Sequence, residues 1–149
     1  MRAIVNVSTG RYVPGADRLH AALDGFDGMK LIYRDCLPPG SPTHQANPYA
    51  FKAFAISEAI KRGATSVLWV DASVVPGDLD PLWRHIERYG YWIADNGWNT
   101  SQWCVDSALA PLGITRGEAM QIPHPVATTF GIHADHRTAM NAFSEWKRL

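Results

Sequence analysis

Short apolar runs alternate along this chain with stretches in which apolar residues recur at the spacing of a helix. The runs predict buried strands at residues 3–7, 29–35, 67–71, 91–97 and 125–134. The amphipathic stretches predict helices that begin near Asp17, Tyr49 and Asp80, a short helix within residues 100–114, and a terminal helix at residues 135–149. Continuously apolar strands that alternate with helices predict an α/β fold, with a mainly parallel sheet flanked by helices on both faces.

The composition is typical of one soluble globular domain, which we expect to span residues 1–149. Hydrophobic residues make up 46% of the sequence and charged residues 19%, and a chain of this length buries one core. The 14 basic residues balance the 14 acidic ones, and neither sign gathers in a run. This balance argues against general nucleic-acid binding and against attachment to an anionic membrane.

No window of the sequence approaches the roughly 20 apolar residues that a membrane-spanning helix needs, and the apolar start of the chain is too short for a signal peptide. We therefore expect no membrane span and a cytoplasmic location. Cys36 and Cys104 are far apart and lack the spacing of a zinc site. Both are interpreted as free thiols.

Asp71 interrupts the apolar stretch "SVLWVDASVV" at the predicted end of the third strand. In open α/β sheets, ligands bind beyond the carboxyl ends of the strands. A carboxylate at such a place can coordinate a divalent cation or accept hydrogen bonds from ribose hydroxyls, and Ser73 would add a weaker oxygen ligand or a phosphate contact. The alternative is an aspartate solvated at the end of a strand.

Three consecutive segments around Asp71 resemble the central part of the nucleotide-sugar glycosyltransferases of the GT-A kind. These are "NPYAFKAFAISEAIKRG", "VLWVDAS" and "DLDPLWRHI". The resemblance implies an αβα sandwich that binds a nucleotide-diphospho-sugar and transfers the sugar to an acceptor hydroxyl. In that family an Asp-x-Asp motif holds the donor diphosphate through Mn²⁺ or Mg²⁺, whereas this chain has Asp71-Ala72-Ser73. Since such transferases are usually longer, the chain resembles a short or truncated member.

The resemblance also implies roles for residues of the first half of the chain. The loop after the first strand would meet the base, ribose and phosphates of the donor through Ser8, Thr9, Gly10, Arg11 and Tyr12. Lys52 resembles a basic residue that reaches the diphosphate or pairs with the aspartate of the motif. The alternative for Lys52 is a lysine on the helix surface whose stem packs against apolar neighbours.

Residues 94–103, "ADNGWNTSQW", combine amides and carboxylates with two indole rings, which is the composition expected at the edge of a sugar site. Trp98 is a candidate for the donor site, although Trp98 and Trp103 would also suit a core. Asp95 or Asp106 would serve as the base of an inverting transfer. His124, held between two prolines, is a candidate metal ligand together with Asp71.

Two alternatives belong to other functional classes. A non-catalytic binding or assembly module would retain a truncated transferase core, and it predicts a defined homo-oligomer without a response to nucleotides. A hydrolase of the haloacid-dehalogenase type would use Asp71 as a nucleophile. The sequence leaves the sugar, the nucleotide base and the acceptor open.

Overall fold

The computed structural model describes residues 1–148 and contains a five-stranded sheet. The strands are β1 (Arg2–Ser8), β2 (Met29–Arg34), β3 (Ser66–Val70), β4 (Tyr91–Asn99) and β5 (Pro123–His133). Their order in the sheet is β2-β1-β3-β5-β4. β1 pairs in parallel with both β2 and β3, whereas β5 is antiparallel to β3. The sheet is therefore mixed and mostly parallel.

Helices connect the strands and flank the sheet, so the predicted α/β fold with helices around a mainly parallel sheet is confirmed. The longer helices are α1 (Val13–Ala22), α2 (Phe51–Lys61), α3 (Asp80–Tyr89) and α7 (Arg137–Arg148). The shorter ones are η1 (Gly10–Tyr12), α4 (Thr100–Trp103), α5 (Asp106–Leu109), η2 (Ala110–Leu112) and α6 (Arg116–Ala119). Within residues 1–148, no helix has both the length and the apolar character needed to cross a membrane.

The chain divides into two compact units. The first unit comprises Met1–Trp92 and the chain from Thr128 onward, and the second unit comprises Ile93–Ala127. The outer part of β4 and the start of β5 thus belong to the second unit. The expectation of a single domain stays a prediction, and each unit is described by itself below.

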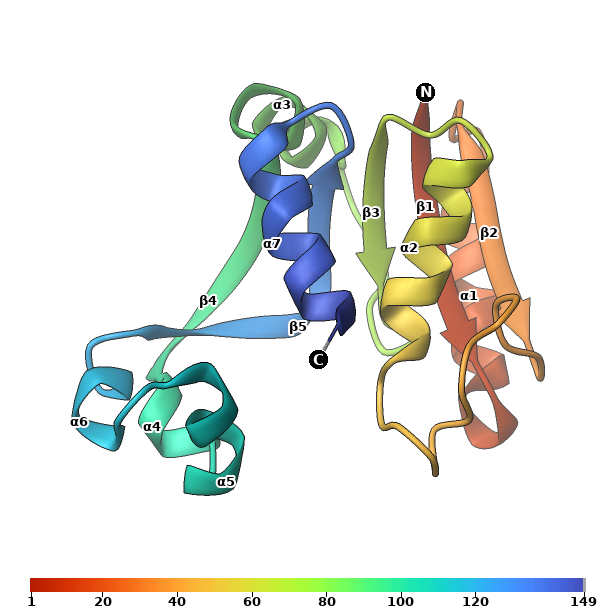
Figure 1. Ribbon diagram of the computed structural model, residues 1–149. Helices are drawn as coiled ribbons and strands as arrows, with labels where there is room; N and C mark the ends of the chain where they lie inside the picture. Colours follow the sequence, from red (N-terminus) through yellow and green to blue (C-terminus); the bar gives the residue numbers. More distant parts are fainter. Residues whose placement is uncertain (149) are drawn as a thin grey trace. The chain divides into compact units, whose positions relative to one another are not determined.

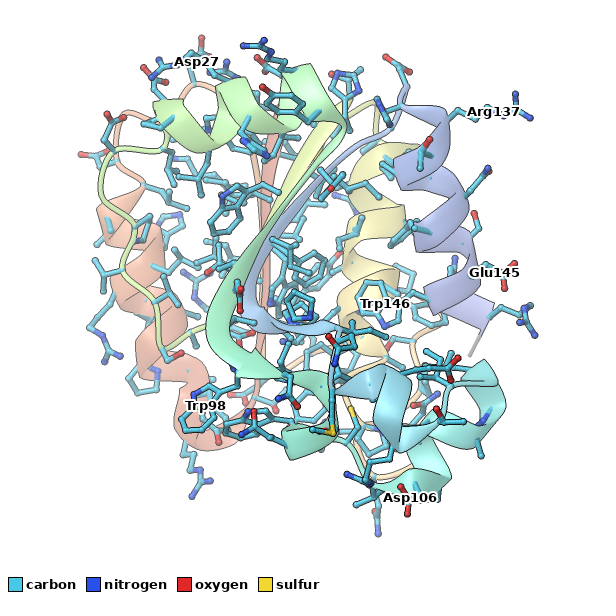
Figure 2. The ribbon with its side chains drawn as sticks, turned by 90° about the vertical axis from the view of Figure 1, so that its left-hand side faces the viewer. Asp27, Trp98, Asp106, Arg137, Glu145 and Trp146 are labelled. Carbon is cyan, nitrogen blue, oxygen red and sulfur yellow. The ribbon has the colours of Figure 1, made fainter. Side chains whose placement is uncertain are left out.

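α2 and α7 cover one face of the sheet in the first unit. Figure 1 shows both helices in front of the strands, and the solvent-facing side chains of α7, such as Arg137 and Glu145, point away from the sheet in Figure 2. The core on this face unites alternate residues of β1 and β3 with Ile56 of α2 and Phe143 of α7. Trp69, near the carboxyl end of β3, is almost fully buried on this face.

α1 and α3 supply the core on the opposite face. Ile4 of β1 and Leu68 of β3 pack with Leu19 of α1 and with Trp83 and Ile86 of α3, all fully or almost fully buried. The strand residues in this core are the ones that lie between those of the first core, because successive side chains of a strand point to opposite sides of the sheet. Burial on both faces therefore gives β1 and β3 nearly continuous runs of apolar residues in the sequence.

Several predicted helix boundaries differ from the structure. α1 begins at Val13 rather than near Asp17, because Pro14 suits a helical first turn. Asp17 caps nothing and instead forms an ion pair with Arg34 at 2.8 Å. The predicted helix within residues 100–114 is divided into α4, α5 and η2. The two cysteines are free thiols, as predicted.

Candidate functional site

The carboxyl ends of β1 and β3 lie side by side in the first unit. β1 is paired in parallel with β2 on one side and with β3 on the other. The chain therefore proceeds from β1 toward one side of the sheet with β2 and toward the other side with β3, and the strand order reverses between β1 and β3. A crevice beyond the strand ends at such a reversal is the usual ligand position in open α/β sheets. Two segments project there: residues 9–12 after β1 and residues 71–73 after β3.

Asp71 follows β3 directly, and two donors hold its carboxylate. Lys52 Nζ lies 3.0 Å from Asp71 Oδ1, and the indole Nε1 of Trp69 donates to the same oxygen at 2.7 Å. The backbone N–H of Asp71 donates to the carbonyl of Thr128 at 2.8 Å, and the Asp71 carbonyl accepts from Val74 N at 3.0 Å. The carboxylate is therefore fixed in orientation at the end of the central strand.

The two members of this ion pair differ in their exposure to solvent. The side chain of Lys52 is 6% exposed and that of Asp71 is 28% exposed. Lys52 Nζ also lies 5.0 Å from the ring centroid of Trp69 and 5.5 Å from that of Tyr49, within the range of a cation–π contact. Lys52 thus pairs with Asp71, which is one of the two roles that the resemblance implied, and the surface position that the helical pattern favoured is wrong. A contact between Lys52 and a diphosphate stays a prediction.

A buried polar pair beneath Asp71 joins β1 to β3. Asn6 Nδ2 donates to the carbonyl of Val70 at 2.7 Å, and Ser8 Oγ donates to Asn6 Oδ1 at 2.7 Å. Asn6 is fully buried and Ser8 almost so. The expected ligand contact of Ser8 is therefore wrong, because its hydroxyl is enclosed and already engaged. Asn6 was not among the predicted site residues, although an asparagine inside an apolar strand is a visible signal of a buried hydrogen bond.

The segment after β1 is exposed at the same edge of the sheet. Gly10 N donates to Asp35 Oδ1 at 2.7 Å, which anchors the turn to the end of β2. Arg11 lies over the ring of Tyr12, 5.2 Å from its centroid, and its Nη2 donates to the Tyr12 hydroxyl at 3.1 Å. Thr9, Arg11 and Tyr12 are all exposed. This segment thus presents a hydroxyl, a cation and an aromatic ring to solvent.

The turn after Asp71 packs against α1 at Gly15. A Cβ added at Gly15 would lie 2.8 Å from the Cβ of Ala72 and closer still to the Ala72 carbonyl oxygen. Only glycine permits this approach of the two backbones. Ser73, the next residue, is exposed at the turn. The structure therefore brings the predicted residues Thr9, Arg11, Tyr12, Lys52, Asp71 and Ser73 into one region of the first unit.

A cavity of about 270 Å³ lies between residues 42–54 and the end of α7 in the first unit. Its lining includes Tyr49, Phe54, Trp146 and Lys147. The ring of Trp146, labelled in Figure 2, packs edge-on against Phe130 at 5.4 Å between centroids. Because the ring of Tyr49 also contacts the Lys52 ammonium, the cavity adjoins the ion pair.

The other predicted site residues belong to the second unit, where Figure 2 labels Trp98 and Asp106. Asp95 Oδ1 accepts from Gly97 N at 2.8 Å, and the Asp106 carboxylate is paired with Arg116 at 2.6 Å. Trp98 is 54% exposed.

His124 is half-buried in the second unit. Its Nδ1 lies 2.9 Å from Asn96 Nδ2, and its ring stacks on that of Trp103 at 5.4 Å. Trp103 is 60% exposed, so the core alternative is wrong for Trp103, as it is for the exposed Trp98. The roles expected of Asp95, Trp98, Asp106 and His124 stay predictions.

Protein side chains alone do not complete the coordination of a divalent cation at Asp71. Residues 1–148 contain no group of three His, Cys, Asp or Glu side chains that could hold a metal ion. Both side-chain hydrogen bonds of Asp71 fall on one oxygen, and one of these donors is a cation. A hard cation such as Mg²⁺ or Mn²⁺ is held by several oxygen ligands. Asp71 supplies one carboxylate, and the nearby Ser73 is uncharged.

Comparison with solved structures shows a glycosyltransferase-like fold. The chain is similar to a glycosyltransferase involved in the glycosylation of the major capsid of PBCV-1, with a TM-score of 0.53 and 13% identity over 96% of this chain. It also matches the galactosyltransferase LgtC, solved in complex with donor and acceptor sugar analogues, with a TM-score of 0.46 and 14% identity over 98% of this chain. The chain spans 65% of the length of each of these structures. No protein-family model and no curated protein matches it.

Proposed function

We propose that the first unit binds a nucleotide-diphospho-sugar at the carboxyl ends of β1 and β3, as the donor site of a glycosyltransferase. The observation that carries this proposal is the position of Asp71. Its carboxylate is partly buried at the end of the central strand, beside the reversal of strand order, and Lys52 and Trp69 orient it. The glycosyltransferase-like fold supports a sugar nucleotide as the ligand.

The exposed groups at this edge match the parts of such a donor. The ring of Tyr12 offers a stacking surface for the base, and the guanidinium of Arg11 offers paired donors to a phosphate. The Asp71 carboxylate is a hydrogen-bond acceptor for ribose hydroxyls, and the hydroxyls of Thr9 and Ser73 would reach the ribose or the diphosphate. Each of these assignments uses a side chain that solvent reaches in the structure.

The proposed reaction is displacement at the anomeric carbon. The acceptor hydroxyl oxygen forms a bond to that carbon, the bond from the carbon to the diphosphate oxygen breaks, and the nucleoside diphosphate leaves with the electron pair. In an inverting transfer the hydroxyl proton passes to a carboxylate, for which Asp95 and Asp106 are the proposed bases. Trp98 is proposed to contact a sugar ring.

Binding is tested by isothermal titration calorimetry and thermal shift with uridine and guanosine diphosphates and their sugar conjugates. We expect at least one nucleotide to raise the melting temperature, since a ligand that binds only the folded protein stabilises it by mass action. Asp71→Asn should abolish this shift. Asp27→Asn is the matched control, because Asp27, labelled in Figure 2, is exposed in the loop before β2, at the amino ends of the parallel strands.

Other outcomes would identify another class of function. Absence of a shift with every nucleotide, combined with a defined oligomer, would overturn the proposal in favour of an assembly module. Phosphatase turnover that Asp71→Asn abolishes would instead indicate a hydrolase with an aspartate nucleophile. A shift that persists in Asp71→Asn would refute the location of the site.

A further inference from the structure

We infer that Lys52 takes the place of a divalent cation on Asp71, so that donor binding by this chain requires no metal ion. This inference rests on the proposed function, because it concerns how the same site accommodates a diphosphate. It follows from the position of one ammonium group, from the charge that this group brings, and from the ligands that surround the carboxylate.

The first step is the position of the ammonium group. Lys52 Nζ lies 3.0 Å from Asp71 Oδ1, where it is an ion-pair partner of the carboxylate. A divalent cation bound to the same carboxylate would lie a few ångströms from this ammonium and would be repelled by it. The ammonium therefore occupies one oxygen of Asp71 and weakens the attraction of this carboxylate for a second cation.

The second step is that Lys52 is held in place. Its side chain is 6% exposed, and its stem enters from the first turn of α2, which packs on the sheet. The rings of Trp69 and Tyr49 lie 5.0 and 5.5 Å from Nζ and favour a cation between them. A metal ion would have to displace an ammonium that ionic, aromatic and packing contacts all retain.

The third step is the shortage of metal ligands and the supply of fixed positive charge. Ser73 is neutral where the Asp-x-Asp pattern has its second carboxylate, and residues 1–148 offer no cluster of three ligating side chains. Arg11 is exposed at the same edge of the sheet. Lys52 neutralises the negative charge of Asp71, so that this carboxylate does not repel a diphosphate, and Arg11 adds a positive charge that can stabilise a phosphate without a metal ion.

The inference is tested on the full chain by titrating a nucleoside diphosphate in excess EDTA and again in Mn²⁺. We expect wild-type affinity in EDTA to lie within about two-fold of that in Mn²⁺, a difference well below one tenfold step in binding constant. Lys52→Met should weaken binding in EDTA by about 10- to 100-fold, the range for loss of a charged hydrogen-bonding group. Mn²⁺ should restore part of this loss, because the substitution frees Asp71.

Two further variants control for structure and charge. Lys61→Met makes the same change at the exposed end of α2 and should leave binding unchanged. Lys52→Arg keeps a cation and should retain binding in EDTA. Far-UV circular dichroism and the melting temperature show whether Lys52→Met is folded. Wild-type binding that Mn²⁺ strengthens more than about tenfold over EDTA would overturn the inference.

A measurement with Mn²⁺ alone separates failure of the inference from failure of the proposed function. The electron paramagnetic resonance signal of free Mn²⁺ is compared for wild type and Asp71→Asn. Equal free Mn²⁺ in the two proteins supports one part of the inference, that Lys52 takes the place of a metal ion on Asp71, even if no nucleotide binds and the proposed function fails by itself. Less free Mn²⁺ with wild type than with Asp71→Asn would show a metal site at Asp71 and would overturn the inference.

Discussion

Gly15→Ala tests whether the contact between α1 and the turn after Asp71 shapes this site. Gly15 lies in the first turn of α1, where a Cβ would meet the backbone and side chain of Ala72. The nearest atom is a backbone carbonyl oxygen rather than the end of a flexible side chain. Either α1 or residues 71–73 must therefore move when the methyl group is added.

The magnitude follows from two opposing effects. An extra methyl group in a well-packed region costs about 1–3 kcal/mol. Alanine in place of glycine within a helix gains about 0.5–1 kcal/mol, chiefly because the unfolded chain loses conformational freedom. The net expectation is a loss of up to about 2.5 kcal/mol in the free energy of unfolding, and of roughly 2–4 °C in melting temperature for each kcal/mol.

Urea denaturation followed by circular dichroism measures this change. Gly77→Ala is the matched control, because a Cβ at Gly77 would meet open space and the φ angle of Gly77 is not left-handed. The control is expected to be neutral or slightly stabilising. We also expect Gly15→Ala to weaken nucleotide binding, since movement of residues 71–73 displaces Asp71. A Gly15→Ala protein at least as stable as wild type would refute the close contact.

Three further predictions concern stability and reactivity. Asn6→Ala should lower the free energy of unfolding by about 1–3 kcal/mol, measured by urea denaturation, because it leaves buried polar groups without a partner; an unchanged midpoint would contradict this role. The hydrogen bond from Arg2 lowers the pKa of Glu87, so the pair stabilises the fold at neutral pH and the contribution is lost as the pH falls through the folded-state pKa. The stability difference between wild type and Glu87→Gln should accordingly shrink on acidification, whereas a difference that is constant with pH would exclude the linkage. Exposed Cys36 should react with a thiol reagent faster than half-buried Cys104, and Cys36→Ser should remove the fast phase.

Local sequence patterns correctly predicted most of the strands and the position of Asp71. A run of five buried residues in β3 requires only that both faces of the strand be covered, and the sequence records this directly as continuous apolar character. The stripe of α2 and the apolar start of β1 were equally visible. The prediction of an α/β fold with a mainly parallel sheet depended on these local features alone.

The sequence pattern did not indicate the direction of β5 or the exact boundaries of the helices. β5 reads as another apolar strand, yet it runs antiparallel to β3, because strand direction depends on the path of the chain between strands rather than on the strand itself. The region 100–114 has helical residues, but extended backbone at Cys104 and Val105 separates α4 from the short helical turns that follow.

The chemistry of the candidate site depended on the tertiary structure. Lys52 and Asp71 are 19 residues apart in the sequence, and Asn6 and Val70 are 64 apart. The amphipathic pattern of α2 favoured a surface position for Lys52, whereas the fold buries its ammonium group beside a carboxylate and two aromatic rings. Apolar periodicity records which positions are buried. Which charges and hydrogen-bonding groups meet at those positions is decided only when the strands and helices pack together.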